Sequence, residues 1–243
     1  AVMLAAAKAF MKMKAQLGDS FKWDRDVFFV GFAAEEANLL GSAHFAKTLA
    51  HGGAIRESLL AEGVKKSPNC MASMGGPMRK ESKRLQGSRT ALQTDQAAKQ
   101  DQVVAIILDE VGWNSKNKNT INGESYDRAA PLLNSLAQAI HVTNVALEFV
   151  HSNTPFGSDH MSFSDQGWQS VLLINADDQE YPNYHKLTDT IENVDFEYAG
   201  KVAKFVGPAM VRLAAADASS GGSERVGVAS KEVHVHVGEP IAA

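Results

Sequence analysis

The sequence predicts an α/β fold of three layers, in which a mixed but mostly parallel central sheet lies between helices on both faces. Short, nearly unbroken apolar runs alternate with longer segments whose apolar residues recur at helical spacing. Unbroken apolar runs are typical of strands covered on both faces, and their alternation with helices is typical of parallel sheets. The 243 residues, 44% of them hydrophobic, suffice for one large domain with a sizeable core.

The expected elements follow in order along the chain. Apolar residues at helical spacing predict a first helix over 1–17, where Met3, Ala7, Phe10 and Leu17 form one stripe. The same pattern predicts two later helices, over 126–140 and 196–214. Apolar runs predict four strands, over residues 26–32, 103–108, 144–150 and 171–174.

Two segments lie outside this pattern. Residues 51–101 are rich in Gly, Ser, Lys, Arg and Gln and are expected to form a flexible, basic insertion. Residues 215–243 contain a Ser/Gly-rich stretch and are expected to form a flexible tail. Its final alternation, VHVHV at 233–237, is compatible with a short strand that places both histidines on one face. The predicted domain therefore covers residues 1–214.

Composition excludes several classes of protein. The formal net charge of -4 gives no indication of nucleic-acid binding through bulk charge. The apolar runs fall far short of a membrane span. Cys70 is the only cysteine, which excludes an internal disulfide framework. The chain opens at Ala1 directly in a helical pattern, and we therefore expect its natural beginning to lie further upstream.

Two adjacent carboxylates, Glu35 and Glu36, follow the apolar run at 26–32. Open α/β sheets gather their ligands beyond the carboxyl ends of their strands. Neighbouring side chains on a loop point in different directions, so that one carboxylate can bind a metal while the other handles a proton. The structural alternative is an acidic pair that opens the following helix and is favoured by the helix dipole.

Further polar groups follow at the ends of other elements. Asp109 ends the run at 103–108, at the same expected edge of the sheet. His185 lies among polar residues, where a neutral imidazole can reach a metal, and Asp189 either orients it or caps the next helix. The consecutive Ser-Asp-His at 158–160 cannot form a serine-nucleophile triad, because adjacent side chains do not reach the relay geometry.

The series of these motifs is more specific than any one of them. FVGFAAEEANLLGS, IILDEVG, SDHMSFSDQG and YHKLTDT, followed by a long amphipathic helix, resemble family twenty-eight of the metallopeptidases over residues 1–214. These are co-catalytic zinc aminopeptidases and carboxypeptidases with a phosphorylase/hydrolase-like sandwich fold. The resemblance implies a zinc exopeptidase acting on peptides, an aminopeptidase first of all, and favours a secreted or other extracytoplasmic location.

The resemblance also implies roles for the motif residues. Glu35 matches the general base that takes a proton from a zinc-bound water, and Glu36 and His185 match ligands of one zinc. Asp109 matches a ligand of the second zinc, and Tyr184 matches a tyrosine that helps to hold the tetrahedral intermediate.

The remaining motif residues are expected beside the substrate or behind the ligands: Asp159, His160 and Asp189. The family pattern needs one more histidine and a bridging aspartate upstream of the first helix, so this chain supplies three of five expected ligands. Two alternatives stay open. One is a single-zinc glutaminyl cyclase, which typically has Trp before its zinc histidine and Asp-Asp-His in the loop, where this chain has Tyr184 and Ser158. The other is a non-catalytic binding domain on the same fold.

Overall fold

The computed structural model of the chain describes residues 1–51, 103–114, 118–153, 155 and 157–215. The expected insertion and the expected tail lie outside the described residues, except for their first residues, 51 and 215.

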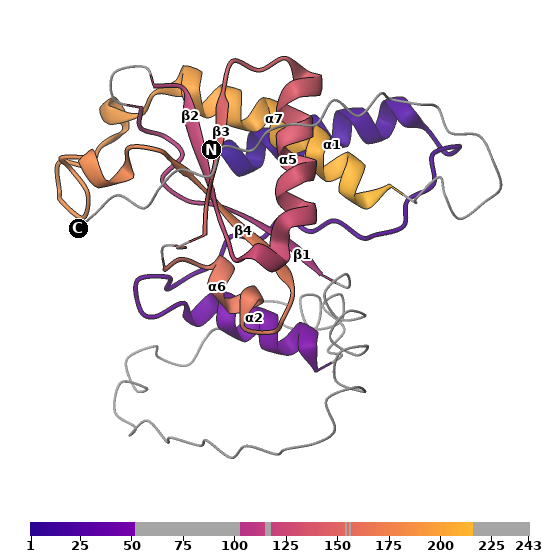
Figure 1. Ribbon diagram of the computed structural model, residues 1–243, viewed down its shortest axis with the longest axis horizontal. Helices are drawn as coiled ribbons and strands as arrows, with labels where there is room; N and C mark the ends of the chain where they lie inside the picture. The colour runs from indigo at the N-terminus through magenta and orange to yellow at the C-terminus, as the bar shows by residue number, and fades with distance from the viewer. Residues whose placement is uncertain (52–102, 115–117, 154, 156, 216–243) are drawn as a thin grey trace, which may run out of the picture.

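A mixed sheet of four strands forms the centre of the described fold (Figure 1). In the order in which they pair, the strands are β1 (Val104–Leu108), β4 (Gln169–Asn175), β2 (Thr120–Glu124) and β3 (Glu148–Ser152). β1 runs parallel to β4 and β2 parallel to β3, whereas β2 and β4 are antiparallel. The predicted mixed, mostly parallel sheet is therefore confirmed.

Helices cover both faces of the sheet, as Figure 1 shows. On one face lie α1 (Val2–Leu17), α5 (Ala130–Thr143) and α7 (Phe196–Ala214), and α7 packs against both of the others. On the other face lie α2 (Leu40–Ala50) and the short α6 (His160–Ser164). Single 3₁₀ turns occupy Asp127–Ala129, Asp178–Glu180 and Ile191–Asn193. No helix in the described part of the chain is both long and apolar enough to cross a membrane.

The side chains of β1 show how the sheet separates two cores. Val104, Ile106 and Leu108 pack into the larger apolar cluster, together with α1, α5 and α7. Ala105 and Ile107 pack into the smaller cluster, together with α2 and α6. Successive residues of a strand point to opposite faces, so a strand covered on both faces must be apolar throughout. This explains the unbroken apolar run.

The longest helix in the described part of the chain, α7, has the bounds that the sequence predicts. Asp195 caps it, because its carboxylate accepts a hydrogen bond from the backbone N–H of Tyr198 at 2.9 Å. α7 crosses α1 closely at Gly207, where an added Cβ would lie only 3.2 Å from the Cβ of Ala9. Glycine at this position lets the two backbones approach.

The expected strand at 26–32 does not form. This segment passes beside β1 without joining the sheet, and a cavity of about 490 Å³ lies between the two. An apolar run indicates burial, but a strand also needs a neighbouring backbone about 4.8 Å away. No described strand pairs with residues 26–32. The prediction of a strand from the apolar run was therefore wrong for this segment.

Smaller differences have local causes. β2 was not expected, because four of the five residues in its sequence, TINGE, are polar or glycine. α6 falls in a segment that was expected to be a loop. β3 begins at Glu148 and not at 144, because α5 continues to Thr143 and ends at Asn144, whose φ of 49° is left-handed.

Candidate metal centre

Glu35 and Glu36 lie in a series of tight turns that precedes α2. The Glu35 carbonyl accepts a hydrogen bond from the Leu39 N–H at 2.8 Å, and the Ala33 carbonyl accepts one from the Gly41 N–H at 3.1 Å. A Cβ at Gly41 would lie 2.5 Å from the Ala33 oxygen, so only glycine fits there. Since α2 begins at Leu40, the two carboxylates belong to this loop and not to the first turn of the helix.

The Glu36 carboxylate contacts the imidazole of His185 from a loop far away in the sequence. Their Oε1 and Nε2 atoms are 2.6 Å apart. Both side chains are open to solvent, with exposed fractions of 72% for Glu36 and 54% for His185. The structure thus brings together the two residues that were expected to share one zinc.

The loop that presents His185 is held by its own side chains. His185 has a left-handed φ of 55°, and its ring stacks on Tyr184 at a centroid distance of 3.9 Å. Asp189 accepts a hydrogen bond from the Tyr181 hydroxyl. Tyr181 in turn packs on Trp113, with ring centroids 4.9 Å apart. Asp189 was expected to orient His185 or to cap the next helix, but in the structure it fastens the two ends of the loop together.

Asp109 follows β1 directly, as expected. Its backbone N–H donates to the Leu173 carbonyl at 3.2 Å, which extends the ladder between β1 and β4. The hydroxyl of Ser158, a buried residue, donates to Asp109 Oδ2 at 2.8 Å. A carboxylate held in this way keeps its second oxygen in a fixed direction, which is what a metal ligand requires.

The pKa of Glu35 is affected by charged groups from all four motifs. The pKa of Glu35 is raised, first by partial burial and then by the charges of Asp109, Glu36 and Asp159, while His185 acts in the opposite direction. Such coupling requires the groups to lie near one another. Charged groups from the four motifs therefore lie within electrostatic range of Glu35, in a loop cluster that is called the rim below.

Tyr184 lies in the same acidic surroundings. Its pKa is raised, chiefly by burial and further by the carboxylates of Glu110, Glu36, Asp109 and Glu35. The phenol therefore stays protonated at neutral pH. A protonated hydroxyl can donate a hydrogen bond to a developing oxyanion.

Glu110 is a member of this cluster that the sequence analysis missed. Its backbone is left-handed, with φ of 46°. Burial, followed by the charges of Asp109 and Asp178, raises its pKa to about 7. In the sequence, only the position of Glu110 next to Asp109 pointed to it. The left-handed backbone conformation of Glu110 cannot be read from residue type or spacing.

His160 and Asp159 lie behind the rim, at the start of α6. His160 is fully buried, and neither ring nitrogen has a hydrogen-bond partner among the described residues. Burial lowers its pKa to about 4, so it is neutral at physiological pH. Burial also raises the pKa of Asp159, against a hydrogen bond from Ser42. His160 itself does not reach the surface at which a substrate would bind.

The donor atoms fit zinc in type, because carboxylate oxygens and imidazole nitrogens are among its usual ligands. Glu36 and His185 are close enough to hold one ion together. Within the described ranges, however, no group of three His, Cys, Asp or Glu side chains is arranged to hold a single metal. The described residues therefore present one close carboxylate–imidazole pair, Glu36 and His185, and, separately, Asp109.

Comparison with solved structures shows the same fold in bacterial aminopeptidases. The LapA aminopeptidase of Legionella pneumophila is 17% identical with a TM-score of 0.54, over 87% of this chain and 45% of LapA. BSAP, a zinc aminopeptidase from Bacillus subtilis, is 19% identical with a TM-score of 0.53, over 86% of this chain and 40% of BSAP. This chain thus spans less than half the length of either enzyme. No curated protein sequence matches it.

The sequence model of peptidase family M28 matches residues 1–210, which is most of the chain. This match covers the loops that carry Glu35, Glu36, Asp109 and His185. The chain belongs to peptidase family M28, a family of metallo-exopeptidases.

Proposed function

We propose that this chain carries part of the active site of a zinc-dependent aminopeptidase. In this proposal Glu36 and His185 hold one zinc ion and Asp109 holds the other. The observation that carries the proposal is the 2.6 Å contact between Glu36 and His185, at the rim where Glu35 and Asp109 also lie. When bound, zinc would supply Lewis-acid polarisation of the peptide carbonyl and would lower the pKa of water.

The proposed role of Glu35 is proton transfer. Glu35 is half-buried in the loop beside Glu36, so that it lies close to the ligand pair while its neighbour points to His185. From there its carboxylate takes the proton from the attacking water and delivers it to the leaving amine. Tyr184, stacked on His185, offers its hydroxyl to the oxygen of the peptide carbonyl as that oxygen becomes negative.

The charge of the rim supports an aminopeptidase over a carboxypeptidase. Besides the proposed ligands and Glu35, four more carboxyl groups lie near the site: Glu110, Asp159, Asp178 and Asp189. An excess of carboxylates attracts the positively charged amino terminus of a peptide and repels its carboxyl terminus. The first residue of a peptide is therefore the one that this rim favours.

The matched pair Glu35→Gln and Glu36→Gln tests these roles, because each variant replaces one of two adjacent carboxylates by its neutral isostere. Both should lower hydrolysis of leucine p-nitroanilide, Glu35→Gln by roughly 10²- to 10⁴-fold, the usual contribution of a general base. Only Glu36→Gln should lower bound zinc, as measured by elemental analysis after gel filtration. If Glu35→Gln lost zinc while Glu36→Gln kept a normal zinc content, Glu35 would be the ligand and Glu36 the general base.

One observation favours a second candidate, a metal-free binding domain on the same fold. Among the described side chains, Glu36 and His185 contact each other and no third donor completes a site. If the purified chain bound no zinc and released no product, while still binding peptides with a free amino terminus, this second candidate would replace the first.

A further inference from the structure

The outer side of α1 carries side chains that the proposed function does not use. α1 contains three basic residues and no acidic residue, and all three are exposed: Lys8, Lys12 and Lys14. The inner side of the helix is buried at Val2, Ala6 and Phe10. The charge that α1 presents to solvent is therefore entirely positive.

Apolar side chains lie among these lysines. Leu4 and Met11 have exposed fractions of 68% and 58%. They are about two helical turns apart and point in nearly the same direction, with Lys8 between them on the same stripe. A single exposed leucine is ordinary on a protein surface. Two exposed apolar side chains on a lysine-rich stripe are typical of helices that lie at a membrane surface.

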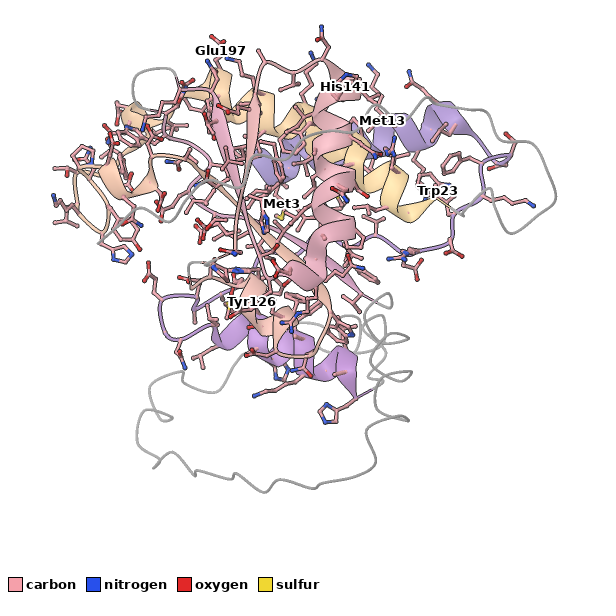
Figure 2. All side chains as sticks on the ribbon, viewed as in Figure 1. Met3, Met13, Trp23, Tyr126, His141 and Glu197 are labelled. Carbon is pink, nitrogen blue, oxygen red and sulfur yellow. The ribbon has the colours of Figure 1, made fainter. Side chains whose placement is uncertain are left out.

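The turn after α1 adds aromatic side chains next to the helix. Phe21 and Trp23 are partly exposed and pack together, with ring centroids 4.6 Å apart. The Lys14 ammonium lies 5.4 Å from the centroid of the Trp23 ring. Figure 2 labels Trp23 at the end of the molecule where α1 terminates. Tryptophan is enriched at the boundary between water and lipid, because it combines an apolar ring with a polar N–H.

The charges of the chain are unevenly distributed. The helical layer of α1, α5 and α7 contains six basic residues and one acidic residue, Glu197, which gives a formal charge of +5. The whole chain has a net charge of -4, so its acidic excess lies outside this layer. Lys204 and Arg212 of α7, the helix that packs against α1, are also exposed. An anionic surface therefore attracts this layer although it repels the chain as a whole.

We propose that the outer side of α1 binds the surface of a membrane that contains anionic phospholipids. The residues that make this contact are called the α1 patch: Leu4, Lys8, Met11, Lys12, Lys14 and Trp23. The lysines contact the headgroups, and the apolar side chains enter the boundary of the acyl chains. The contact is peripheral, since no helix in the described ranges is long and apolar enough to cross a membrane. The inference is independent of the proposed function.

The exposed apolar side chains decide between lipid and other polyanions. A lipid surface has an apolar layer directly beneath its anionic groups, whereas the backbone of a nucleic acid presents its phosphates without one. Burial of Leu4 and Met11 therefore adds to the electrostatic attraction on a lipid surface, and it adds nothing on a phosphate backbone.

The α1 patch and the rim lie at different ends of the molecule. In Figure 1 the orange loops after β4, which include His185, lie on the left, whereas α1 ends on the right. Contact with a membrane through the α1 patch therefore leaves the rim open to peptides in the surrounding water.

The test is co-sedimentation of the full chain with lipid vesicles. One set contains phosphatidylcholine alone, and the other also contains phosphatidylglycerol at about a third of the lipid. The chain should bind the mixed vesicles saturably and should not bind the neutral ones. High salt should release it, because exposed charges are screened over a shorter distance as the ionic strength rises.

Two double variants separate the contributions of charge and apolar burial. Lys8→Glu with Lys12→Glu should weaken binding to the mixed vesicles at least about 25-fold, because each lysine near an anionic surface contributes roughly fivefold. Leu4→Ser with Met11→Ser keeps every charge and should weaken binding at least about tenfold. All four side chains are exposed, so the fold should be kept, which thermal unfolding of each variant checks.

The matched control changes the same residue types at the rim. Lys186 and Leu187 are both exposed, and Lys186→Glu with Leu187→Ser should leave vesicle binding unchanged. Equal weakening in this control and in the α1 variants would overturn the proposal, because the contact would then not be specific to α1.

Three further results would overturn the proposal. The first is an absence of binding to the mixed vesicles, and the second is equal binding to neutral vesicles. The third is unchanged vesicle binding of the Leu4→Ser, Met11→Ser variant together with equally tight binding of soluble polyglutamate, which would show that the partner is an acidic polypeptide. Since none of these measurements involves zinc or hydrolysis, a failure here leaves the proposed function untouched.

Discussion

The centre of the sheet and the rim above it are built in opposite ways. All seven residues of β4 are buried, whereas Glu36 and His185 expose more than half of their side chains. Of the seven described non-glycine residues with positive φ, five lie in the rim loops: Ala34, Asn38, Leu39, Glu110 and His185. Such conformations cost of order 1–3 kcal/mol each. The buried centre therefore contributes stability, whereas the rim keeps its polar side chains in place at a cost in conformational free energy. Mutations in the centre should therefore change stability, and mutations in the rim should change zinc binding.

The largest expected effect is a loss of stability on mutation of the centre, with little loss on mutation of the rim. Leu173 in β4 is fully buried, whereas Leu187 next to the His185 loop is fully exposed. Leu173→Ala should lower the free energy of unfolding by about 2–5 kcal/mol, because it leaves a cavity in the core. Leu187→Ala should change it by less than about 0.5 kcal/mol. Urea denaturation of both variants measures this contrast, and equal losses would contradict the distinction between centre and rim.

The second expected effect is a pH dependence of stability caused by His160, which lies between the centre and the rim. Its pKa of about 4 in the folded chain is below the unfolded value of 6.5. Between these values the unfolded chain binds more protons, so stability falls as the pH is lowered from 6.5 to 4 and the loss is complete below 4. This shift corresponds to about 3 kcal/mol.

His160→Leu removes the titrating group and keeps the site apolar. Its stability should therefore fall less than that of the wild type across pH 6.5 to 4, as measured by urea denaturation at several pH values. The raised pKa of Asp159 acts in the opposite sense in both proteins and cancels in the comparison. Parallel curves for the two proteins would show that the buried imidazole is not the source of the pH dependence.

The smallest expected effect is a change in zinc affinity caused by a mutation beside the rim. Ser158 and Ser164 are both buried, but only Ser158 donates to Asp109, whereas Ser164 pairs with Ser170 at 2.7 Å. Ser158→Ala should lower zinc affinity by roughly 10- to 100-fold, the usual loss when a supporting hydrogen bond to a ligand is removed. Ser164→Ala should leave zinc affinity unchanged. Calorimetric titration with zinc measures both, and an equal change in both would indicate a general loss of structure.

Secondary structure could be predicted from the sequence where a segment has a clear pattern of apolar residues. α1 and α7 have helical periodicity, and β1 and β4 are short apolar runs, so their bounds were predicted to within two residues. β2 was missed because its partner sets its structure. Its polar Asn122 and its Gly123 pair with Ile174 and Leu173 of β4, far along the chain.

The candidate site was predictable to a different degree. The motif series brought Glu35, Glu36, Asp109 and His185 to attention, and the structure places them around one rim. The sequence did not predict that Glu110 turns inwards or that Asp189 binds Tyr181. Both depend on backbone turns and on contacts between loops, which residue type and spacing do not specify.

The central claim is that Glu36 and His185 form a ligand pair for one zinc ion. Its most direct test is calorimetric zinc titration of the wild type, Glu36→Gln, His185→Gln and the double variant. Each single substitution should lower zinc affinity at one site by roughly 100-fold or more, beyond the usual effect of a supporting residue. The double variant should then lose little further, because the pair acts as a unit. Independent losses that multiply, or no loss in either single variant, would contradict the claim.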